Sequence, residues 1–270
     1  MIKDHWKKEI ALESHLQKGV KGKDVERVQE WLNIHRVNHP LWHQEVVVDG
    51  DFGPITEAAI KDFQYLFRIA PTGIVDEMTW LRLVTPMKQA FQHGMDISLG
   101  VRRHCVEVAM KHVEQHPIEL GNNEGPWVRS YMNGKDGDPY YWCMGAYQTW
   151  VDQAFSYNKL KFTDQMPMTF SCDTLGNHGL KTGRLIKAAD IVKMKEKDLK
   201  KKIQPGDAFL RVKVKDKDWT HTGMILSVEG DIAVCAEGNT NDEGSRNGYE
   251  ACVRRRNLRK GDLDVFTLNV

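Results

Sequence analysis

Cys143 stands at a junction between two sequence patterns, in the run YYWCMGAYQTW (140–150). Apolar residues recur at helical spacing after the cysteine, and this pattern predicts a helix whose first turn contains Cys143. Free backbone N–H groups and the positive end of the helix dipole favour a thiolate there, which is where nucleophilic cysteines are found. The apolar positions behind this prediction are Ala146, Tyr147, Trp150, Val151 and Ala154.

A hairpin expected further along the chain supplies a base and a carboxylate. Residues 224–228 and 232–236 are predicted as strands around a tight turn. Folding about this turn brings the start of the first strand, with His221, beside the end of the second, with Glu237 and Asn239. We therefore expect an imidazole and a carboxylate to meet at one end of a sheet, with an amide nearby.

These residue types fit one kind of chemistry. A cysteine peptidase needs a thiolate, a histidine that passes the proton, and a third group that orients the histidine. Cys143, His221 and Glu237 supply them in that order. Backbone N–H groups at the start of the cysteine helix are then placed to bind an oxyanion. Each residue alone also fits a structural role, because the chain has 11 histidines and buried cysteines are usually inert.

The other four cysteines are expected to be free thiols without a catalytic role. Cys105 falls on the apolar face of a helix that begins near residue 101. Cys172 falls in the stretch SCDTLGNHG (171–179), which we expect to form a loop over the cleft. Cys235 and Cys252 fall in strand-like segments. No CxxC spacing occurs, so no zinc site is expected, and we predict neither a metal nor a cofactor.

Residues 16–86 predict a small unit of three amphipathic helices. The first has Asp24 as its N-cap, the second opens at Pro54, and the third has Asp76 as its N-cap. Between the first two, a short strand-like run leads into a turn at Asp49.

A set of residues through this unit follows the pattern G…DVxxVQxxLN…VDGDFGPxTxxAIxxFQ…TGIVDxxTWxxL, which resembles the type-1 peptidoglycan-binding domain. The resemblance implies that the unit binds the sugar or stem peptide of the bacterial wall, with Asp49 and Asp51 as candidate contacts. The segment IHRVNHPLWHQEVV (34–47) is longer than the pattern leads us to expect. The matching residues are Gly22, Asp24, Val25, Val28, Gln29, Leu32, Asn33, Asp49, Gly50, Phe52, Gly53, Thr56, Ala59, Ile60, Phe63, Gln64, Thr72, Gly73, Asp76, Thr79, Trp80 and Leu83.

Residues 101–257 carry a second set of motifs: ELGNNEGPWVRSYMNGKDGDPYYWCMGAYQTWV, PGDAFL, THTGMILSV and EGNTNDEGSRNGYEACVRRR. Together they resemble the CHAP domain, a cysteine, histidine-dependent amidohydrolase/peptidase. The resemblance implies a papain-like fold, in which a cysteine-bearing helix packs on an antiparallel sheet. It implies Cys143 as nucleophile, His221 as general base, Glu237 as orienting acid and Asn239 as the amide that follows the acid.

The same segment leaves several details open. Trp142 and Trp219 are candidate substrate contacts. Met144-Gly145 follows the cysteine where small residues such as alanine are commoner in the family, and Thr222 follows the histidine where valine is common. Some CHAP domains bind calcium before the cysteine, but a plain turn is favoured for the stretch that contains Asp136 and Asp138. The Lys-rich stretch KMKEKDLKKKIQPGD predicts a solvated helix, with contact to an anionic wall polymer as the alternative.

The chain is therefore predicted as α+β, with a three-helix wall-binding domain at 1–86, a linker at 87–100 and a catalytic domain at 101–270. The formal net charge of +1 gives no argument for nucleic acid, and no apolar run is long enough to insert into a membrane. The N-terminus lacks the apolar core of a signal peptide. We expect a monomer, made in the cytoplasm, that reaches the wall through a holin-type pore or a dedicated secretion machine.

The expected activity is hydrolysis of an amide bond in wall peptide, either next to L-alanine or within the stem or cross-bridge. A phage endolysin is favoured over a secreted toxin effector on the domain layout. Two alternatives remain: a non-catalytic wall-binding protein with a degenerate second domain, and an amidase of small thiol conjugates such as glutathionylspermidine. The wall-binding unit argues against the second.

Overall fold

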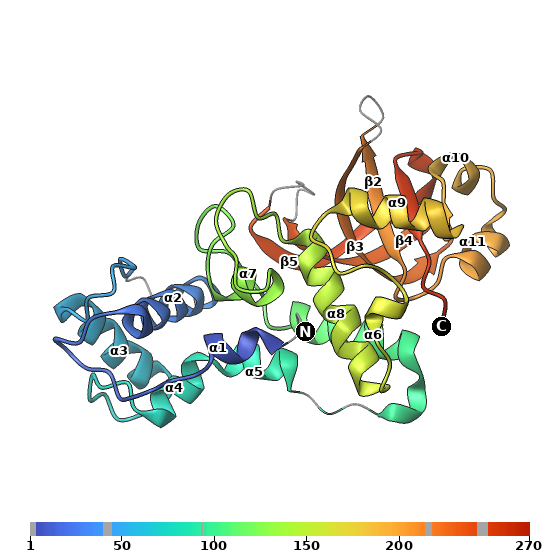
Figure 1. Cartoon of the computed structure of the whole chain (residues 1–270). Helices are drawn as coiled ribbons and strands as arrows, with labels where there is room; N and C mark the ends of the chain where they lie inside the picture. The colour runs from blue at the N-terminus through green and yellow to red at the C-terminus, as the bar shows by residue number, and fades with distance from the viewer. Residues whose placement is uncertain (1–3, 40–44, 93, 95, 214–217, 242–247) are drawn as a thin grey trace.

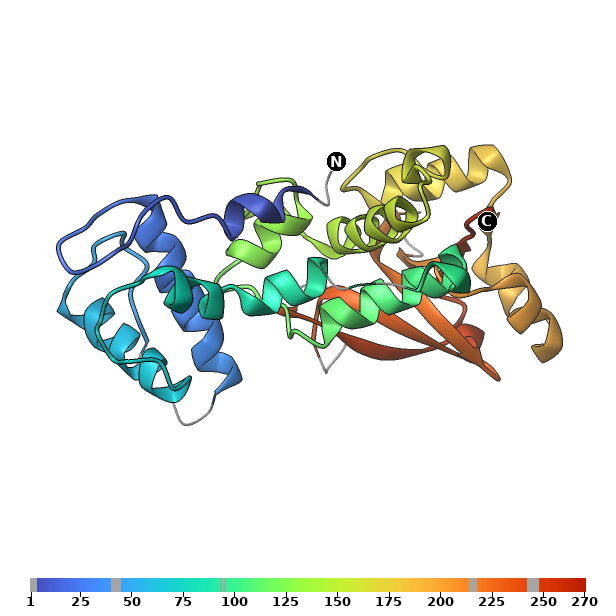
Figure 2. The same ribbon diagram turned by 90° about the horizontal axis from the view of Figure 1, so that it is seen from below.

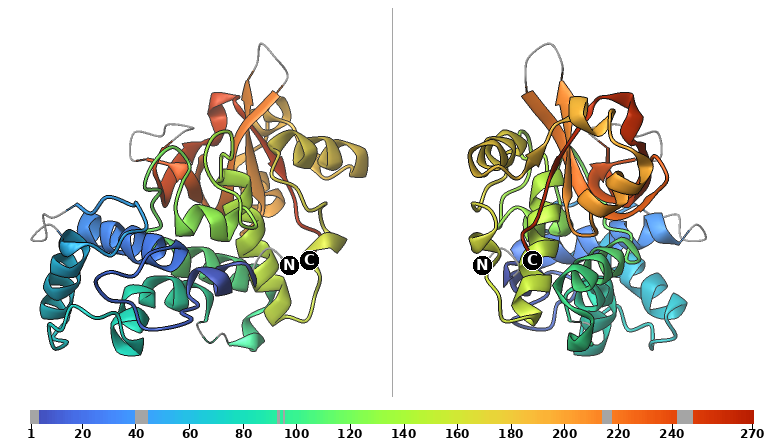
Figure 3. Two further views of the ribbon diagram at one scale, coloured as in Figure 1. Left: turned by 60° about the vertical axis from the view of Figure 1, so that its left-hand side comes forward. Right: turned by 90° about the vertical axis from the view of Figure 1, so that its right-hand side faces the viewer.

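The computed structural model describes residues 4–39, 45–92, 94, 96–213, 218–241 and 248–270. The predicted α+β class is confirmed: a group of helices lies at one end of the molecule and a six-stranded antiparallel sheet at the other (Figure 1). Helices α10 (Ala188–Ile191) and α11 (Glu196–Lys202) lie at the end away from the N-terminal helices (Figures 1 and 3).

The N-terminal unit contains the three expected helices. The predicted opening of the second helix at Pro54 is confirmed, and Asp76 caps the third by accepting from the N–H of Thr79 at 2.8 Å. Two details were wrong: Gly22 rather than Asp24 is the N-cap of the first helix, and the run before Asp49 is not a strand. The helices of this part are α1 (Trp6–Glu9), α2 (Lys23–Asn38), α3 (Pro54–Leu66), α4 (Glu77–Leu83) and α5 (Thr85–Phe91).

A buried glutamine holds the turn that precedes each of α3 and α4. Gln29 accepts from the N–H of Gly50 at 2.9 Å, and Gln64 accepts from the N–H of Gly73 at 2.9 Å. Both glycines have positive φ, 69° and 75°, which a glycine adopts without strain. Each glutamine also donates to a backbone carbonyl of its turn, Gln29 to Asp51 and Gln64 to Ile74. The repeated device explains why Gln and Gly recur at matching places in the sequence.

The sheet has the order β1-β6-β2-β3-β4-β5. Helix α8 packs against its central strands β3 and β4, and α6 packs against α8. Every residue of α8 from Cys143 to Phe155 is buried, so this helix is the centre of the larger part of the molecule. The remaining elements are α6 (Val101–Val113), α7 (Pro126–Tyr131), α8 (Cys143–Tyr157), α9 (Cys172–Thr182), β1 (Leu185–Ile186), β2 (Ala208–Lys213), β3 (Asp218–Glu229), β4 (Ile232–Thr240), β5 (Glu250–Asn257), β6 (Leu263–Phe266) and 3-10 turns at Ile97–Leu99, Phe162–Asp164 and Leu258–Lys260.

The two parts are joined by side-chain contacts as well as by the chain. Helices α1, α5 and α7 lie between the group formed by α2, α3 and α4 and the sheet (Figure 2). The indole rings of Trp31 on α2 and Trp127 on α7 meet edge to face, with centroids 6.2 Å apart. Arg129 of α7 ion-pairs with Glu9 of α1 at 2.8 Å and with Glu30 of α2 at 2.6 Å.

Candidate active site

Cys143 is the first residue of α8, so the prediction that it lies in the first turn of a helix is confirmed. Its side chain is buried, with 4% of the residue exposed. The backbone N–H groups of a helix's first turn have no partner within the helix, and they point toward the space in front of it. The cysteine therefore lies where an anion is stabilised by the helix itself.

The hairpin that carries the predicted base is present. Strands β3 and β4 pair antiparallel around Gly230, with Met224 opposite Ala236. The expectation that His221 meets the segment after residue 236 is confirmed: its Nε2 lies 2.9 Å from Oε2 of Glu237. Both side chains are fully buried.

The charges of this group favour a thiolate beside an imidazolium. A hydrogen bond with Cys172, followed by the interaction with His221 and a bond from the N–H of Thr222, holds the pKa of Cys143 well below its usual value, although burial opposes this. Burial also opposes protonation of His221, but Cys143 and Glu237 outweigh it and raise the pKa of His221 to about 9. Because Glu237 occupies Nε2, Nδ1 is the ring nitrogen left for the thiol; it has no other partner among the described residues.

Arg256 is a further charged residue of the site that the sequence analysis did not identify. Its Nε donates to Oε1 of Glu237 at 2.7 Å, and its guanidinium lies over the ring of Phe209 with 5.2 Å to the centroid. Burial raises the pKa of Glu237, but the bonds from His221 and Arg256 more than offset it and keep this pKa low. Glu237 is thus an ionised carboxylate in a buried place. Strand alternation in EACVRRR was the signal for an arginine on this face.

Among the described residues, the side chain of Asn239 contacts Asn123, Trp142 and Gly248 rather than the imidazole of His221. Its side-chain amide lies 2.7 Å from Oδ1 of Asn123, and it reaches the N–H of Trp142 and the carbonyl of Gly248, each at 3.1 Å. Its backbone has a positive φ of 53°. Its contacts among the described residues therefore connect the end of β4 to the residue that precedes α8. They support a positioning role rather than the catalytic role that the sequence analysis assigned to it.

A pocket of about 220 Å³ opens in front of Cys143. The predicted contact Trp219 lines it, and its indole N–H donates to Asp264 at 3.1 Å. Two carboxylates, Asp173 and Asp218, also line it and share a hydrogen bond; burial raises the pKa of Asp173, and Asp218 adds to that rise. The lining residues are Tyr141, Cys143, Phe170, Ser171, Cys172, Asp173, Asp218, Trp219 and Thr220.

The segment predicted as a loop over the cleft is instead helix α9, which begins at Cys172. Ser171 caps it by accepting from the N–H of Thr174 at 3.3 Å, and Gly183 ends it in the left-handed conformation. Gly176 lets the helix approach the sheet, because a Cβ there would lie 2.5 Å from the ring of Trp219. The Ser and Gly boundaries were visible in the sequence, but two internal glycines masked the helical pattern.

The three other candidate substrate contacts, Trp142, Asp49 and Asp51, each pack against or pair with residues of the protein itself. Trp142 is fully buried and stacks on Tyr131, with centroids 5.6 Å apart, so substrate does not reach it and that prediction is corrected. The carboxylate of Asp49 accepts from Gln29 at 2.8 Å and from the N–H of Asp51 at 2.9 Å, which makes it part of the turn. Asp51 is partly exposed and pairs with Lys21 at 2.6 Å.

Cys105, Cys235 and Asp136 have structural explanations. Burial raises the pKa of Cys105 to about 12 and raises that of Cys235 as well, so both are inert thiols. Asp136 pairs with Arg129 at 2.9 Å. In the part of the chain that the structure describes, no group of three or more His, Cys, Asp or Glu side chains is arranged to hold a metal.

No described helix has the length and apolar character needed to cross a membrane.

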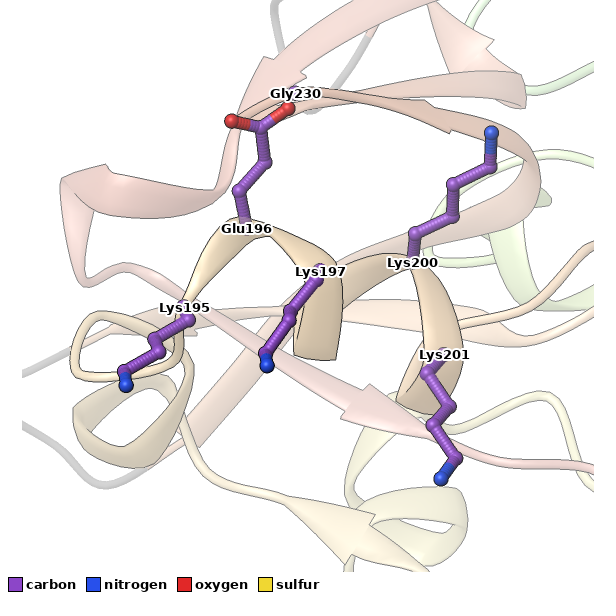
Figure 4. Close-up of a pocket in the computed structure, with 6 residues that line it drawn as sticks. All are labelled: Lys195, Glu196, Lys197, Lys200, Lys201 and Gly230. Atoms are coloured by element: carbon purple, nitrogen blue, oxygen red, sulfur yellow. The ribbon is translucent and has the colours of Figure 1, made fainter.

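The Lys-rich stretch forms α11 and borders an open hollow of about 720 Å³. Figure 4 shows that Lys200 and Lys201 extend in opposite directions, while Glu196 extends toward Gly230. The ammonium groups do not converge on one point. The arrangement agrees with the predicted solvated helix face.

Residues 21–83 match the family described as "Putative peptidoglycan binding domain". The matched segment runs from the residue before the N-cap of α2 to the last residue of α4. The resemblance stated for this unit is therefore confirmed, and the chain contains a module of the kind that associates with the cell wall. Comparison with curated proteins gives no match.

Proposed function

We propose that this protein is a peptidoglycan hydrolase that cleaves an amide bond in cell-wall peptide through an acyl-enzyme on Cys143. The observation that carries the proposal is the buried line of Cys143, His221 and Glu237, in which the histidine is held by the carboxylate and faces the thiol. The wall-binding segment supplies the substrate class.

The proposed reaction has two halves. The Cys143 thiolate attacks the carbonyl carbon of the scissile amide, and N–H groups at the start of α8 stabilise the oxyanion. The imidazolium of His221 gives its proton to the leaving amine, and the acyl-thioester remains. A water molecule then attacks the thioester while His221 takes its proton. This step releases the carboxylic acid and restores the Cys143 thiolate and the His221 imidazolium. Glu237 keeps the ring oriented and stabilises the imidazolium throughout.

Attachment to a wall-binding module raises the local concentration of substrate at the pocket. The contacts between Arg129, Glu9 and Glu30 support a fixed relation between the two parts. A fixed module selects bonds at one distance from the wall polymer that it holds. We further propose that the protein acts at the wall after export through a holin-type pore or a dedicated secretion machine, as a phage endolysin or as an effector.

Clearing of purified sacculi by the wild type and by Cys143→Ala tests this proposal. We expect the wild type to clear and Cys143→Ala to bind sacculi without clearing them. Cys105→Ala is the matched control, because this core thiol lies outside the pocket, and it should clear normally. Clearing by Cys143→Ala would refute the nucleophile, and failure of the wild type on walls of every chemotype would leave a wall-binding protein.

Mass spectrometry of the released fragments identifies the bond. Free lactyl groups together with L-alanine N-termini identify an amidase. New termini within the stem or cross-bridge identify an endopeptidase. Cleavage of small thiol conjugates without sedimentation on sacculi would favour the alternative amidase.

A further inference from the structure

Two cysteines, not one, face the pocket. Cys143 is the first residue of α8 and Cys172 is the first residue of α9, and both line the same cavity of about 220 Å³. Both are reduced and buried, with 4% and 7% of each residue exposed. Two helices of 15 and 11 residues thus present a thiol from their first turn to one small space.

We propose that Cys172 is a second functional thiol of the site, which donates an S–H hydrogen bond to Sγ of Cys143 and so holds the nucleophile as a thiolate. This inference rests on the proposed function of Cys143. It makes Cys172 a residue that touches the reacting atom, in a segment that the sequence analysis expected to be a loop.

The surroundings decide which thiol keeps its proton. His221 and the N–H of Thr222 face Cys143 and stabilise its negative form. Cys172 is instead faced by Asp173 on its own helix and by Asp218 on β3, and both carboxylates oppose a second negative charge there. The pKa of Cys172 is raised well above its usual value, first by its bond with Cys143 and then by burial. One thiol is therefore the acceptor and the other the donor.

The titratable groups near the pair come from three elements. His221 and Asp218 belong to β3, Asp173 to α9, and Glu237 of β4 acts through the ring of His221. The N–H groups at the start of α8 add to the stabilisation of the thiolate. Removal of the Cys172 donor therefore weakens the thiolate without abolishing it.

Alkylation of Cys143 by iodoacetamide, followed by mass spectrometry as a function of pH, measures the thiolate directly and needs no wall substrate. In Cys172→Ala we expect the midpoint to rise by about one pH unit or more, since hydrogen bonds to charged groups are the strong ones. Cys172→Ser keeps a donor and should stay near the wild type. An unchanged midpoint in Cys172→Ala, or an equal rise in both variants, would overturn the donor role.

A second measurement tests the contact in the unaltered chain. Hydrogen peroxide oxidises the Cys143 thiolate to a sulfenic acid with release of hydroxide. The Cys172 thiol then displaces water to form a disulfide, so that two thiols lose two hydrogens and the peroxide becomes two waters. We expect the full-length protein to lose the mass of two hydrogens, with a peptide linking residues 143 and 172, and a thiol reductant to reverse it. Oxidation of Cys143 to sulfinic acid without that link would show that the thiols are not in contact.

These outcomes separate the two proposals. If Cys143→Ala still clears sacculi, the proposed function fails whatever the alkylation profile shows. If clearing depends on Cys143 while its alkylation midpoint is the same in Cys172→Ala, the function stands and the role of Cys172 is lost.

Discussion

Nε2 of His221 lies 2.9 Å from Oε2 of Glu237, and neither side chain is exposed to solvent. Arg256 approaches the same carboxylate from β5 and donates to Oε1 at 2.7 Å. Glu237 is thus shared between an imidazole and a guanidinium. An ionised carboxylate in a buried place both orients the histidine and favours its protonated form.

Replacement of the shared carboxylate tests this arrangement. Glu237→Gln keeps the shape but removes the charge that faces His221 and Arg256. We expect the rate of sacculus clearing to fall about 10²-fold or more, because the imidazolium is neither oriented nor stabilised. Binding to sacculi should persist, and circular dichroism checks that the variant is folded.

Glu229→Gln is the matched control for this substitution. Glu229 lies on the same hairpin, but its side chain is 53% exposed and pairs with Arg255. Its loss should leave clearing unchanged. Equal losses in the two variants would contradict an orienting role for Glu237.

The thiolate and imidazolium predict the pH dependence of clearing. The pKa of His221 is raised to about 9, so the proton needed by the leaving amine is present below that pH and is lost as the pH rises through it. The pKa of Cys143 is lowered, so activity on the acid side is lost only well below the ordinary range of a thiol. Initial clearing rates across pH should therefore show a broad maximum with an alkaline limb near pH 9.

Glu237→Gln should move that alkaline limb. Without the carboxylate the pKa of His221 falls, and the limb shifts to lower pH in the residual activity. A limb that stays in place would mean that another group controls it.

The junction between the two parts predicts a large effect of Arg129→Ala on stability. Arg129 holds Glu9, Glu30 and Asp136, and the first two carboxylates are mostly buried. The pKa of Glu9 is lowered despite burial, whereas burial dominates at Glu30 and raises its pKa. Removal of the guanidinium leaves buried charges without a partner of opposite sign. We therefore expect a loss of about 3–5 kcal/mol in the free energy of unfolding, measured with urea.

Arg255→Ala provides the comparison for Arg129→Ala. Arg255 also forms an ion pair, with Glu229, but both side chains are more than half exposed. Pairs of that kind contribute little, so a change of no more than about 0.5 kcal/mol is expected. If Arg129→Ala matched Arg255→Ala, the contacts of Arg129 would not hold the two parts together.

Local sequence patterns were sufficient to predict part of the fold and part of the candidate site. The helix that starts at Cys143 follows from apolar spacing, and the meeting of His221 with Glu237 follows from folding a hairpin about its turn. Both features depend on residues that are close along the chain. The place of the turn, which Gly230 marks, sets the hairpin register up to a one-residue shift between Ile225 and Ser227 that the sequence does not signal.

Features that depend on distant segments were missed. Cys172 lies 29 positions after Cys143, and its helix approaches Trp219 at Gly176, a residue whose lack of a side chain hides this buried face from the sequence pattern. Trp142 was expected to meet substrate because it precedes the cysteine, yet packing against Tyr131 buries it. Arg129 carries no local sign that it pairs with residues 99 and 120 positions away. Sequence spacing cannot report contacts that tertiary packing creates.

Gly145 shows how tertiary packing restricts which side chains fit beside the nucleophile. It stands two residues after Cys143, where a Cβ would lie 2.6 Å from the carbonyl oxygen of Tyr131 and 2.5 Å from Sδ of Met132. The carbonyl belongs to the backbone at the end of α7 and cannot turn aside. Gly145→Ala should therefore push the start of α8 away from α7, at a cost of about 1–3 kcal/mol in stability.

The same shift should displace the nucleophile, because Cys143 and Gly145 belong to one helical turn. We expect slower alkylation of Cys143 as well as slower clearing in Gly145→Ala. Gly94→Ala is the control, since a Cβ there meets no atom of the described residues within 4 Å and should change neither quantity. If Gly145→Ala clears and unfolds like Gly94→Ala, the contact with α7 does not fix the position of Cys143.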